Sequence, residues 1–543
     1  MIREELAKKI TEAIAQKFEG HDTLGFSMEP SVHPEHGDYA SNVALLLGKN
    51  LSRSPLDVAH ILAEELSKNT EIFAKVETAA PGFINFYLSP DILFTEFKNI
   101  LREENKYGGS DKNSGKKARV EYVSANPTGP LHIGNARGGP LGESICRVLE
   151  KTGYKVLREY YHNDTGTQVE KMGDTLWYWY QKLLGLETEF PEGGYLGEYL
   201  REVAETAVSQ LGKDLKKGDL ERLTRFGLEQ IFKENSDTLN RLRIKFDSVV
   251  KESELLSSGK TAKIVEELKK KGVAKEKEGA IWFSPKTGIL EDDQDSVLIR
   301  STGQPTYFAS DAAYHKEKFS SGYDLVVDIL GSNHHGHVPR LKALAEVFEF
   351  DPAKFLAVLY QYVRVKKDGV AVKMSKRAGT YVTAKEILDE VGADSVTFFF
   401  LMNNTDSHMD FDLNLAREQS QKNPVFYVQY AHARISSILQ KATFQGFAEE
   451  NLKLLDKEEE LQLIKHLLKF PEVVDDTARD FQVQRLPRHA LEIARAFHNF
   501  YEKHRVITDN PDLSEARLML VSATQIILKN LFQLMNISLP EKM

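Results

Sequence analysis

The feature that most constrains the fold is a turn rich in glycine and proline, ANPTGPLHIGNARGGPLG at residues 125–142. The run before it, ARVEYVSA, is strand-like, and after it Leu141, Ile145 and Leu149 recur at helical spacing until Gly153, which can end a helix. A second strand-like run, YKVLREYYHND, follows. Strand, turn, helix and strand in this order predict a βαβ unit and hence a parallel sheet.

The same turn indicates a ligand. Glycines where a strand runs into a helix let the backbone approach a bound group, and the first free N–H groups of the helix bind anions. The turn contains neither GxxxxGK[ST] nor GxGxxG, so it is neither a P-loop nor the dinucleotide fingerprint. His132 and Asn135 lie three residues apart at the predicted helix start, where both side chains can reach one phosphate. Such a short match is weak evidence on its own.

A second signal, VKMSKRAGT, lies some 240 residues downstream and places Lys373, Ser375 and Lys376 ahead of a glycine. Two lysines and a hydroxyl on a short loop can neutralise a triphosphate. A lysine-rich loop is more often only solvated surface. The two signals stand after the first and the last predicted strands, and this order favours a nucleotide site.

Length and composition set the domain organisation. A chain of 543 residues corresponds to roughly three or four domains of about 150 residues each. We predict an N-terminal domain at 1–110, a linker within REENKYGGSDKNSGKK, a central domain at 116–404 with a mainly helical insertion at about 170–290, and a helical domain at 405–543. After the insertion, the sheet pattern resumes with GAIWFS, DSVLIRS, PTYFAS and YDLVVDILG.

Charge and cysteine content narrow the class of protein. The net charge is −9, so a nucleic-acid partner has to meet a local basic surface. The lone Cys146 excludes an internal disulfide and a multi-cysteine zinc site. The sequence contains no run of 18 or more apolar residues, so we expect no membrane span. The acidic residues near the N-terminus do not fit a signal or transit peptide. We therefore expect a cytoplasmic protein that makes no use of a membrane.

The two signals resemble the signatures of class I aminoacyl-tRNA synthetases, which are written HIGH and KMSK. Here they stand as HIGN and KMSK, with Asn135 in place of the second histidine. Segments along nearly the whole chain are similar, in the same order, to arginyl-tRNA synthetases. They are HGDYASNVALLL, PGFINFYLS, REYYHNDTGTQ, PTYFASDAAYH, GSNHHGHVPR, NPVFYVQYAHARI, AFHNFYEKHRV and ISLPEKM.

This resemblance implies an α/β fold: a doubly wound, Rossmann-like catalytic domain with an insertion, a small α/β N-terminal domain that contacts tRNA, and an all-α anticodon-binding domain. It implies activation of L-arginine by ATP, supplied as MgATP, and transfer of the arginyl group to the 3′-terminal ribose of arginine tRNA. It also implies a monomer, no zinc, and adenylate formation that generally needs bound tRNA. A cysteinyl enzyme lacks support because its zinc-ligating cysteines are absent. A non-catalytic, synthetase-like RNA-binding protein remains the alternative, but such a protein should have lost a signature.

The resemblance also assigns site residues. Those assigned to ATP activation are His132, Gly134, Asn135, Lys373, Ser375 and Lys376. The first motif comprises Ala125, Asn126, Pro127, Thr128, Gly129, Pro130, Leu131, His132, Ile133, Gly134 and Asn135. Those assigned to arginine binding are Glu121, Ser124, Asn126, Tyr307, Asp311, His334 and His335.

The residues themselves fit an arginine pocket. A guanidinium needs carboxylates arranged to match its planar donors. Tyr307 and Asp311 are four residues apart and would share one face of a helix. The histidines of SNHHGH could be a metal cluster, but adjacent histidines do not favour convergence on one ion, and we predict no metal site.

Towards the C-terminus aromatic and basic side chains alternate. They are Phe426, Tyr427, Tyr430, His432, Arg434, Phe497, His498, Tyr501, Lys503 and Arg505. Aromatic rings stack on single-stranded bases and cations bind phosphates. In most helices with such alternation the aromatic side chains belong to the core and the basic side chains face solvent. Only the resemblance therefore favours an anticodon-binding role.

Overall fold

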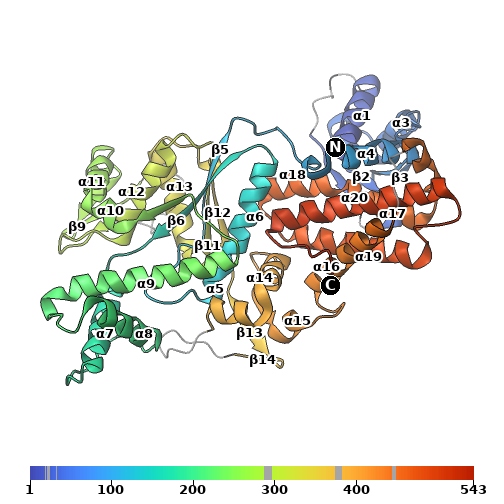
Figure 1. Cartoon of the computed structure of the whole chain (residues 1–543). Helices are drawn as coiled ribbons and strands as arrows, with labels where there is room; N and C mark the ends of the chain where they lie inside the picture. Colours follow the sequence, from blue (N-terminus) through green and yellow to red (C-terminus); the bar gives the residue numbers. More distant parts are fainter. Residues whose placement is uncertain (19, 21–24, 32, 286–295, 373–381, 443–447) are drawn as a thin grey trace.

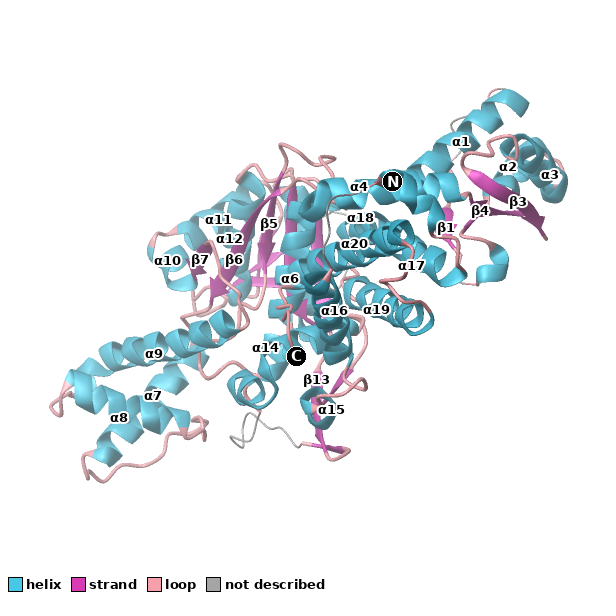
Figure 2. Cartoon of the chain, turned by 45° about the vertical axis from the view of Figure 1, so that its right-hand side comes forward, coloured by secondary structure: helices cyan, strands magenta, loops and turns pink. Residues whose placement is uncertain are grey.

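The computed structural model describes residues 1–18, 20, 25–31, 33–285, 296–372, 382–442 and 448–543. A parallel sheet with helices on both faces occupies the centre of the molecule (Figure 1). A helical arm projects from one side of it, and a helical bundle with a small N-terminal domain lies on the other side, as both views show (Figure 2).

The described part of the N-terminal domain contains four α-helices and a four-stranded antiparallel sheet. Its first helix, α1 (Ile2–Lys17), buries Leu6, Ile10 and Ile14 on one face, as their spacing predicts. The sheet has the order β1-β2-β4-β3. The remaining elements are β1 (Met28–Pro30), β2 (Tyr39–Ser41), α2 (Val43–Leu51), α3 (Pro55–Leu66), β3 (Phe73–Ala79), β4 (Phe83–Leu88) and α4 (Pro90–Glu103).

The central sheet is parallel throughout, with the strand order β12-β11-β5-β6-β7. Its strands are β5 (Lys117–Glu121), β6 (Lys155–His162), β7 (Ser248–Lys251), β11 (Leu325–Gly331) and β12 (Phe355–Tyr360). The chain proceeds outward from β5 to β6 and, in the opposite direction, from β11 to β12, so the order reverses between β5 and β11. A crevice at the carboxyl ends of the strands, at such a reversal, is where open α/β sheets bind ligands.

Helices cover both faces of this sheet. On one face lies α6 (Gly138–Lys151), which packs on β5, β6 and β11 and confirms the predicted βαβ unit. On the other, α12 (Tyr307–Ser320) and α13 (Val338–Val347) enclose a separate apolar core with Val326 and Phe355. PTYFAS was expected to be a strand, but α12 begins at Tyr307 because the apolar run continues at helical spacing. A short apolar run alone does not distinguish a buried strand from a helix.

The insertion consists of a helical arm followed by a small sheet. The arm contains α7 (Thr167–Leu183), α8 (Tyr199–Leu211) and α9 (Leu220–Arg241), and β7 then returns the chain to the edge of the central sheet. GAIWFS and DSVLIRS lie in a separate antiparallel sheet, not in the parallel one. The other elements are α10 (Glu252–Ser257), α11 (Lys260–Lys270), β8 (Ala274–Lys277), β9 (Ala280–Phe283) and β10 (Ser296–Ile299).

A connecting region leads from β12 to the helical bundle. It contains a small sheet in which β13 lies between β14 and β15, and the helix α14, which is interrupted by non-helical backbone at Gly392 (φ 77°). The short strand β15 interrupts the predicted all-helical region after residue 405. The elements are β13 (Val363–Lys367), β14 (Val370–Ala371), α14 (Ala384–Met402), β15 (Met409–Asp412) and α15 (Leu413–Arg417).

The C-terminal bundle is built around one central helix, α20 (Pro511–Met535). By length and composition this helix could cross a membrane, since its most apolar 18-residue stretch has a mean hydropathy of 1.4. However, 72% of that stretch is buried inside the protein. That burial is expected of a helix at the centre of a bundle. The other helices are α16 (Pro424–Lys441), α17 (Glu458–Leu468), α18 (Phe470–Asp480) and α19 (Arg485–Lys503).

The N-terminal domain is docked on this bundle. Arg3 forms a bidentate pair with Asp476 at 3.0 and 2.8 Å. In the predicted linker, the buried Tyr107 stacks on Phe470 of α18, with ring centroids 6.4 Å apart. The segment between the first two domains is therefore packed against the third.

Candidate active site

The first signature forms the turn that leaves the carboxyl end of β5. Val123 and Ser124 have φ values of 69° and 36°, in the left-handed region that β-branched residues rarely adopt. His132 caps the short helix α5 (Ile133–Ala136), and its Nδ1 accepts a hydrogen bond of 2.9 Å from the Gly134 N–H. This bond assigns the proton of a neutral imidazole to Nε2, which can then donate to a phosphate oxygen.

Three glycines of the same stretch serve packing rather than ligand binding. A Cβ at Gly138, Gly139 or Gly142 would lie 3.1, 2.7 or 2.2 Å from the nearest atom of Tyr360, Ile244 or Tyr122, respectively. These glycines let α6 approach its neighbours closely. Of the glycines that raised the expectation of a ligand, the structure therefore uses these three to place the helix.

The chain that follows the second signature pairs with the first one. The Ile133 N–H donates to the Val382 carbonyl at 3.2 Å, and the Ala384 N–H donates to the Leu131 carbonyl at 2.8 Å. Lys373, Ser375 and Lys376 themselves lie outside the described residues. Because residue 382 follows this loop directly, the fold brings at least one end of the loop to the first signature.

The helical arm also holds the first signature. The Tyr199 hydroxyl donates to the Thr128 carbonyl at 2.6 Å, and the Asn235 amide donates to the adjacent Gly129 carbonyl at 3.2 Å. These bonds come from α8 and α9, so two helices of the insertion fix successive peptide groups of the turn.

Glu121, the last residue of β5, is 5% exposed. Its carboxylate accepts a 2.8 Å hydrogen bond from the Ser124 hydroxyl and forms an ion pair with Lys318. Asn126, in contrast, is exposed and donates to Gln168 at 3.2 Å. Hydrogen bonding and ion pairing thus fix Glu121 and Ser124 at the end of the strand, whereas Asn126 lies at the surface of the protein.

Asp311 lies on α12, one turn after the exposed Tyr307. Burial, together with the charges of Glu121 and Glu252, raises the pKa of Asp311 to about 7 against the opposing effect of His315. No side chain in the described part of the chain forms an ion pair or hydrogen bond with this carboxylate. The sequence-predicted pair of Tyr307 and Asp311 therefore presents an unpaired acid beside two others.

Two buried residues of this site were not predicted. Glu252, at the start of α10, is 3% exposed and accepts a 2.7 Å bond from Thr165. Lys318, which is fully buried, pairs with Glu121 and, at 2.6 Å, with Asp328. Although burial lowers it, the charges of Asp328 and Glu121 keep the pKa of Lys318 above its usual value. The sequence spacing could have indicated Lys318 as a residue of this site, because it lies seven residues after Asp311 and hence on the same helical face.

His334 and His335 lie in a short 3-10 helix, Ser332–His337, at the carboxyl end of β11, and both are exposed. His335 is within 3.2 Å of the Ser332 carbonyl. Among the described residues, no three His, Cys, Asp or Glu side chains are grouped so that they could hold a metal ion. The histidines border the same strand ends as Glu121.

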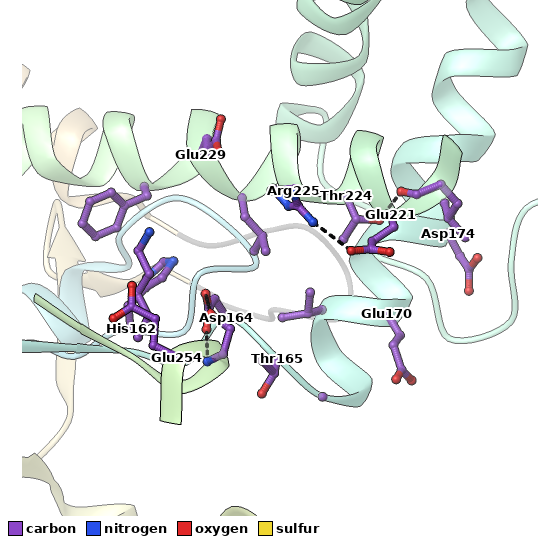
Figure 3. A pocket seen from close by; sticks show the side chains of 17 residues that line it. His162, Asp164, Thr165, Glu170, Asp174, Glu221, Thr224, Arg225, Glu229 and Glu254 are labelled. Carbon is purple, nitrogen blue, oxygen red and sulfur yellow. Dashed lines mark hydrogen bonds and ion pairs between the residues drawn. The ribbon is translucent and has the colours of Figure 1, made fainter. Parts of the chain in front are cut away.

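A pocket of about 930 Å³ adjoins these strand ends and is lined by residues of β6, β7, α7, α9 and α10. Residues of α9 lie across from His162 and Asp164 (Figure 3). Its acidic side chains are Asp164, Glu170, Asp174, Glu221, Glu229 and Glu254. Only Arg225 and Lys251 are basic. This excess of carboxylates does not favour an RNA phosphate in the pocket.

The C-terminal bundle carries a basic and aromatic pocket of about 810 Å³. The Arg434 guanidinium lies between the rings of Tyr430 and Tyr501, at 4.8 and 4.9 Å from their centroids. The aromatic and basic residues predicted to contact RNA do not all lie at one surface. His432 and Phe497 are fully buried core residues, whereas Tyr430, Arg434 and Tyr501 line the pocket. Lys441, His504, Arg505 and Lys542 complete the basic lining.

The fold and site define a class I aminoacyl-tRNA synthetase. Residues 96–438 match the family model for the catalytic domain of class I tRNA synthetases (R), and residues 428–543 match the DALR anticodon binding domain. The solved arginyl-tRNA synthetase of Thermus thermophilus has the same fold, with a TM-score of 0.79 at 22% identity over 100% of both chains.

The particular family follows from the remaining matches. Residues 4–88 match the arginyl tRNA synthetase N-terminal domain. An arginine–tRNA ligase of Syntrophotalea carbinolica is 42% identical over 526 residues, 95% of each chain. That of Carboxydothermus hydrogenoformans is 41% identical over 534 residues, 97% of this chain and 95% of the relative. The chain belongs to the arginyl-tRNA synthetase family, which confirms the expected fold class and ligase activity, and nothing in these comparisons supports the non-catalytic alternative.

Proposed function

We propose that the chain activates L-arginine with ATP and transfers the arginyl group to the 3′-terminal ribose of arginine tRNA, at the carboxyl edge of its parallel sheet. The observation that carries this proposal is the unpaired carboxyl of Asp311, near Glu121 and Glu252 at the strand ends where the first signature begins. Arginine carries two positive groups, and ionised oxygens are the partners that a guanidinium prefers.

In the first step, a carboxylate oxygen of arginine attacks the α-phosphorus of ATP and the bond to pyrophosphate breaks. We assign His132, Gly134 and Asn135, together with Lys373, Ser375 and Lys376, to the ATP phosphates. Magnesium enters as MgATP, since phosphate oxygens are ligands that this ion prefers. In the second step, a ribose hydroxyl of tRNA attacks the arginyl carbonyl and AMP leaves. No side chain acts as a covalent nucleophile, so catalysis rests on positioning and electrostatics.

For arginine we assign Asp311 and Tyr307 to the guanidinium, with Glu121, Ser124, Asn126, His334 and His335 around the rest of the molecule. Lys318 neutralises part of the charge of Glu121, which supports a site with one strong carboxylate instead of a diffuse acidic patch. Selectivity then follows from Asp311, because lysine offers a point charge in place of a planar fork.

For tRNA we propose two contact surfaces. The pocket around Arg434 offers Tyr501, 36% exposed, for stacking and Arg505 for phosphate. In the N-terminal domain, Phe83, the first residue of β4, is 39% exposed. We place the domain boundaries at 1–110, 116–404 and 405–543, and propose a cytoplasmic monomer.

An aminoacylation assay with each amino acid in turn on total tRNA tests this function. We expect charging with arginine alone, in the presence of ATP and magnesium. Equal charging with another amino acid would contradict the assigned pocket. No charging with any of them, by a folded protein, would favour the RNA-binding alternative.

A further inference from the structure

Arg137 follows the first signature by two residues and is fully buried, yet it has no carboxylate partner among the described residues. Its guanidinium instead donates to four backbone carbonyls, those of Gln361 at 2.8 Å, Asn404 at 2.9 Å, Ser407 at 3.3 Å and Asn403 at 3.5 Å. Burial lowers its pKa to about 10, so it stays charged at neutral pH.

The four carbonyls belong to two segments that leave the catalytic site. Gln361 joins β12 to β13, and β13 precedes the second signature in the chain. Residues 403–407 join the end of α14 to β15, where the chain turns toward the helical bundle. One side chain therefore ties the first signature to the approach of the second signature and to the start of the C-terminal region.

The helix α14 also contacts the first signature at its N-terminal end. The residue at its N-terminus, Ala384, donates to the Leu131 carbonyl at 2.8 Å, and its C-cap, Asn403, accepts from Arg137 at 3.5 Å. The break at Gly392 lets α14 change direction between these two contacts. Both ends of α14 are thus fixed to residues 131–137, seven consecutive positions of the chain.

Burying the Arg137 guanidinium in this way destabilises the fold, so stability alone does not explain the residue. A buried charge without a counter-charge costs several kcal/mol, and an apolar residue of similar volume would avoid that cost. The carbonyls at the end of a helix offset part of it, because they carry the negative end of the helix dipole. An apolar side chain cannot supply the planar set of donors of a guanidinium. These donors fix the segment that carries Arg137, Gln361 and residues 403–407 in one geometry.

We propose that Arg137 is a positioning residue that couples the adenylate site to tRNA held by the C-terminal bundle. RNA bound to the bundle biases the position of residues 403–407, and Arg137 transmits this bias to α5 and the first signature. The two ligands then bind cooperatively, although Arg137 touches neither. This inference rests on the proposed function, because it requires an adenylate and a tRNA as the two ligands.

The test measures the Kd of arginine tRNA for the full chain, with and without a saturating non-hydrolysable arginyl-adenylate analogue. In the parent protein we expect the analogue to change the Kd of tRNA by about 5-fold or more, the lower range of allosteric coupling. In Arg137→Met we expect that ratio to fall to within about 2-fold of one, while the Kd of each ligand alone changes by less than about 3-fold. Arg137→Lys, which keeps the charge but not the fork, should give an intermediate ratio.

Arg147→Met is the matched control. Arg147 lies on α6, ten residues after Arg137, and also bridges to the C-terminal region, through the Gln533 carbonyl at 3.0 Å and the Asn536 side chain at 2.9 Å, but it contacts neither Gln361 nor residues 403–407 in any hydrogen bond among the described residues. This variant should keep the parent ratio. A ratio unchanged in Arg137→Met, a loss shared by Arg147→Met, or a parent ratio of one would overturn the coupling role.

The same preparations separate this inference from the proposed function. A parent protein that charges tRNA with arginine while the ratio fails to respond to Arg137 refutes only the coupling. A parent protein that charges no tRNA refutes the function itself. If Arg137→Met does not fold, Arg137→Lys decides the matter, since a full parent ratio in that variant would contradict the need for the fork.

Discussion

Replacing Asp311 by asparagine is the sharpest test of the arginine pocket, because it keeps the shape of the side chain and removes its charge. In the free protein this carboxyl has no partner among the described residues, and its pKa is about 7. A bound guanidinium would supply the missing charge and favour the ionised form. The variant should therefore lose arginine selection rather than stability.

The size of the effect follows from these two facts. Removing one partner of a desolvated charge pair costs about 2–5 kcal/mol, or about 30- to 4000-fold in kcat/KM for arginine. With a pKa of about 7, roughly nine tenths of the carboxyls are ionised at pH 8 and about one tenth at pH 6. Because protons compete with arginine for Asp311, the affinity of the parent protein should fall about 10-fold between pH 8 and pH 6. That of Asp311→Asn should change little.

Steady-state aminoacylation measures kcat/KM for arginine, and calorimetric titration of arginine from pH 6 to 8 measures the pH dependence of its affinity, both on the full chain. Asp480→Asn is a suitable control, since Asp480 pairs with Arg485 in the C-terminal bundle and should leave arginine binding intact. Unchanged kcat/KM for arginine in Asp311→Asn would refute the pocket. An identical pH dependence in parent and variant would show that another group titrates.

Three further predictions concern ATP, tRNA and the order of the steps. Lys376→Ala should lower kcat far more than it raises the KM for ATP in steady-state aminoacylation, because the lysine stabilises charge that develops in the transition state; a pure KM effect would mean that it only holds ground-state ATP. Tyr501→Ala should raise the KM for tRNA by about 5- to 150-fold, the cost of about 1–3 kcal/mol for one stacked base, with the KM for arginine unchanged; an unaltered KM for tRNA would remove this pocket from the RNA path. ATP–pyrophosphate exchange dependent on arginine should be weak until tRNA is added, as in an induced fit, and strong exchange without tRNA would refute that requirement but not the ligase assignment.

Local patterns in the sequence were enough to predict the centre of the fold. The spacing of Leu141, Ile145 and Leu149 gave α6, and the apolar runs on either side gave β5 and β6. The periodicity of a helix or strand is a property of neighbouring residues, so it can be read without knowing the rest of the chain. The same limit explains the errors: PTYFAS begins a helix, and GAIWFS and DSVLIRS form their own sheet, because neither burial nor strand partners are local properties.

The sequence by itself determined the chemistry that is available at the site: the two signatures, the Tyr307–Asp311 pair, and a family to which they belong. Only the tertiary structure decided which of these groups act on one another. Lys318 and Glu121 are 197 positions apart, and Arg137 meets carbonyls more than 200 positions away. In the sequence these are a lysine and an arginine like many others. Their roles come from desolvation and the fixed charges around them, and both exist only where distant segments are packed together.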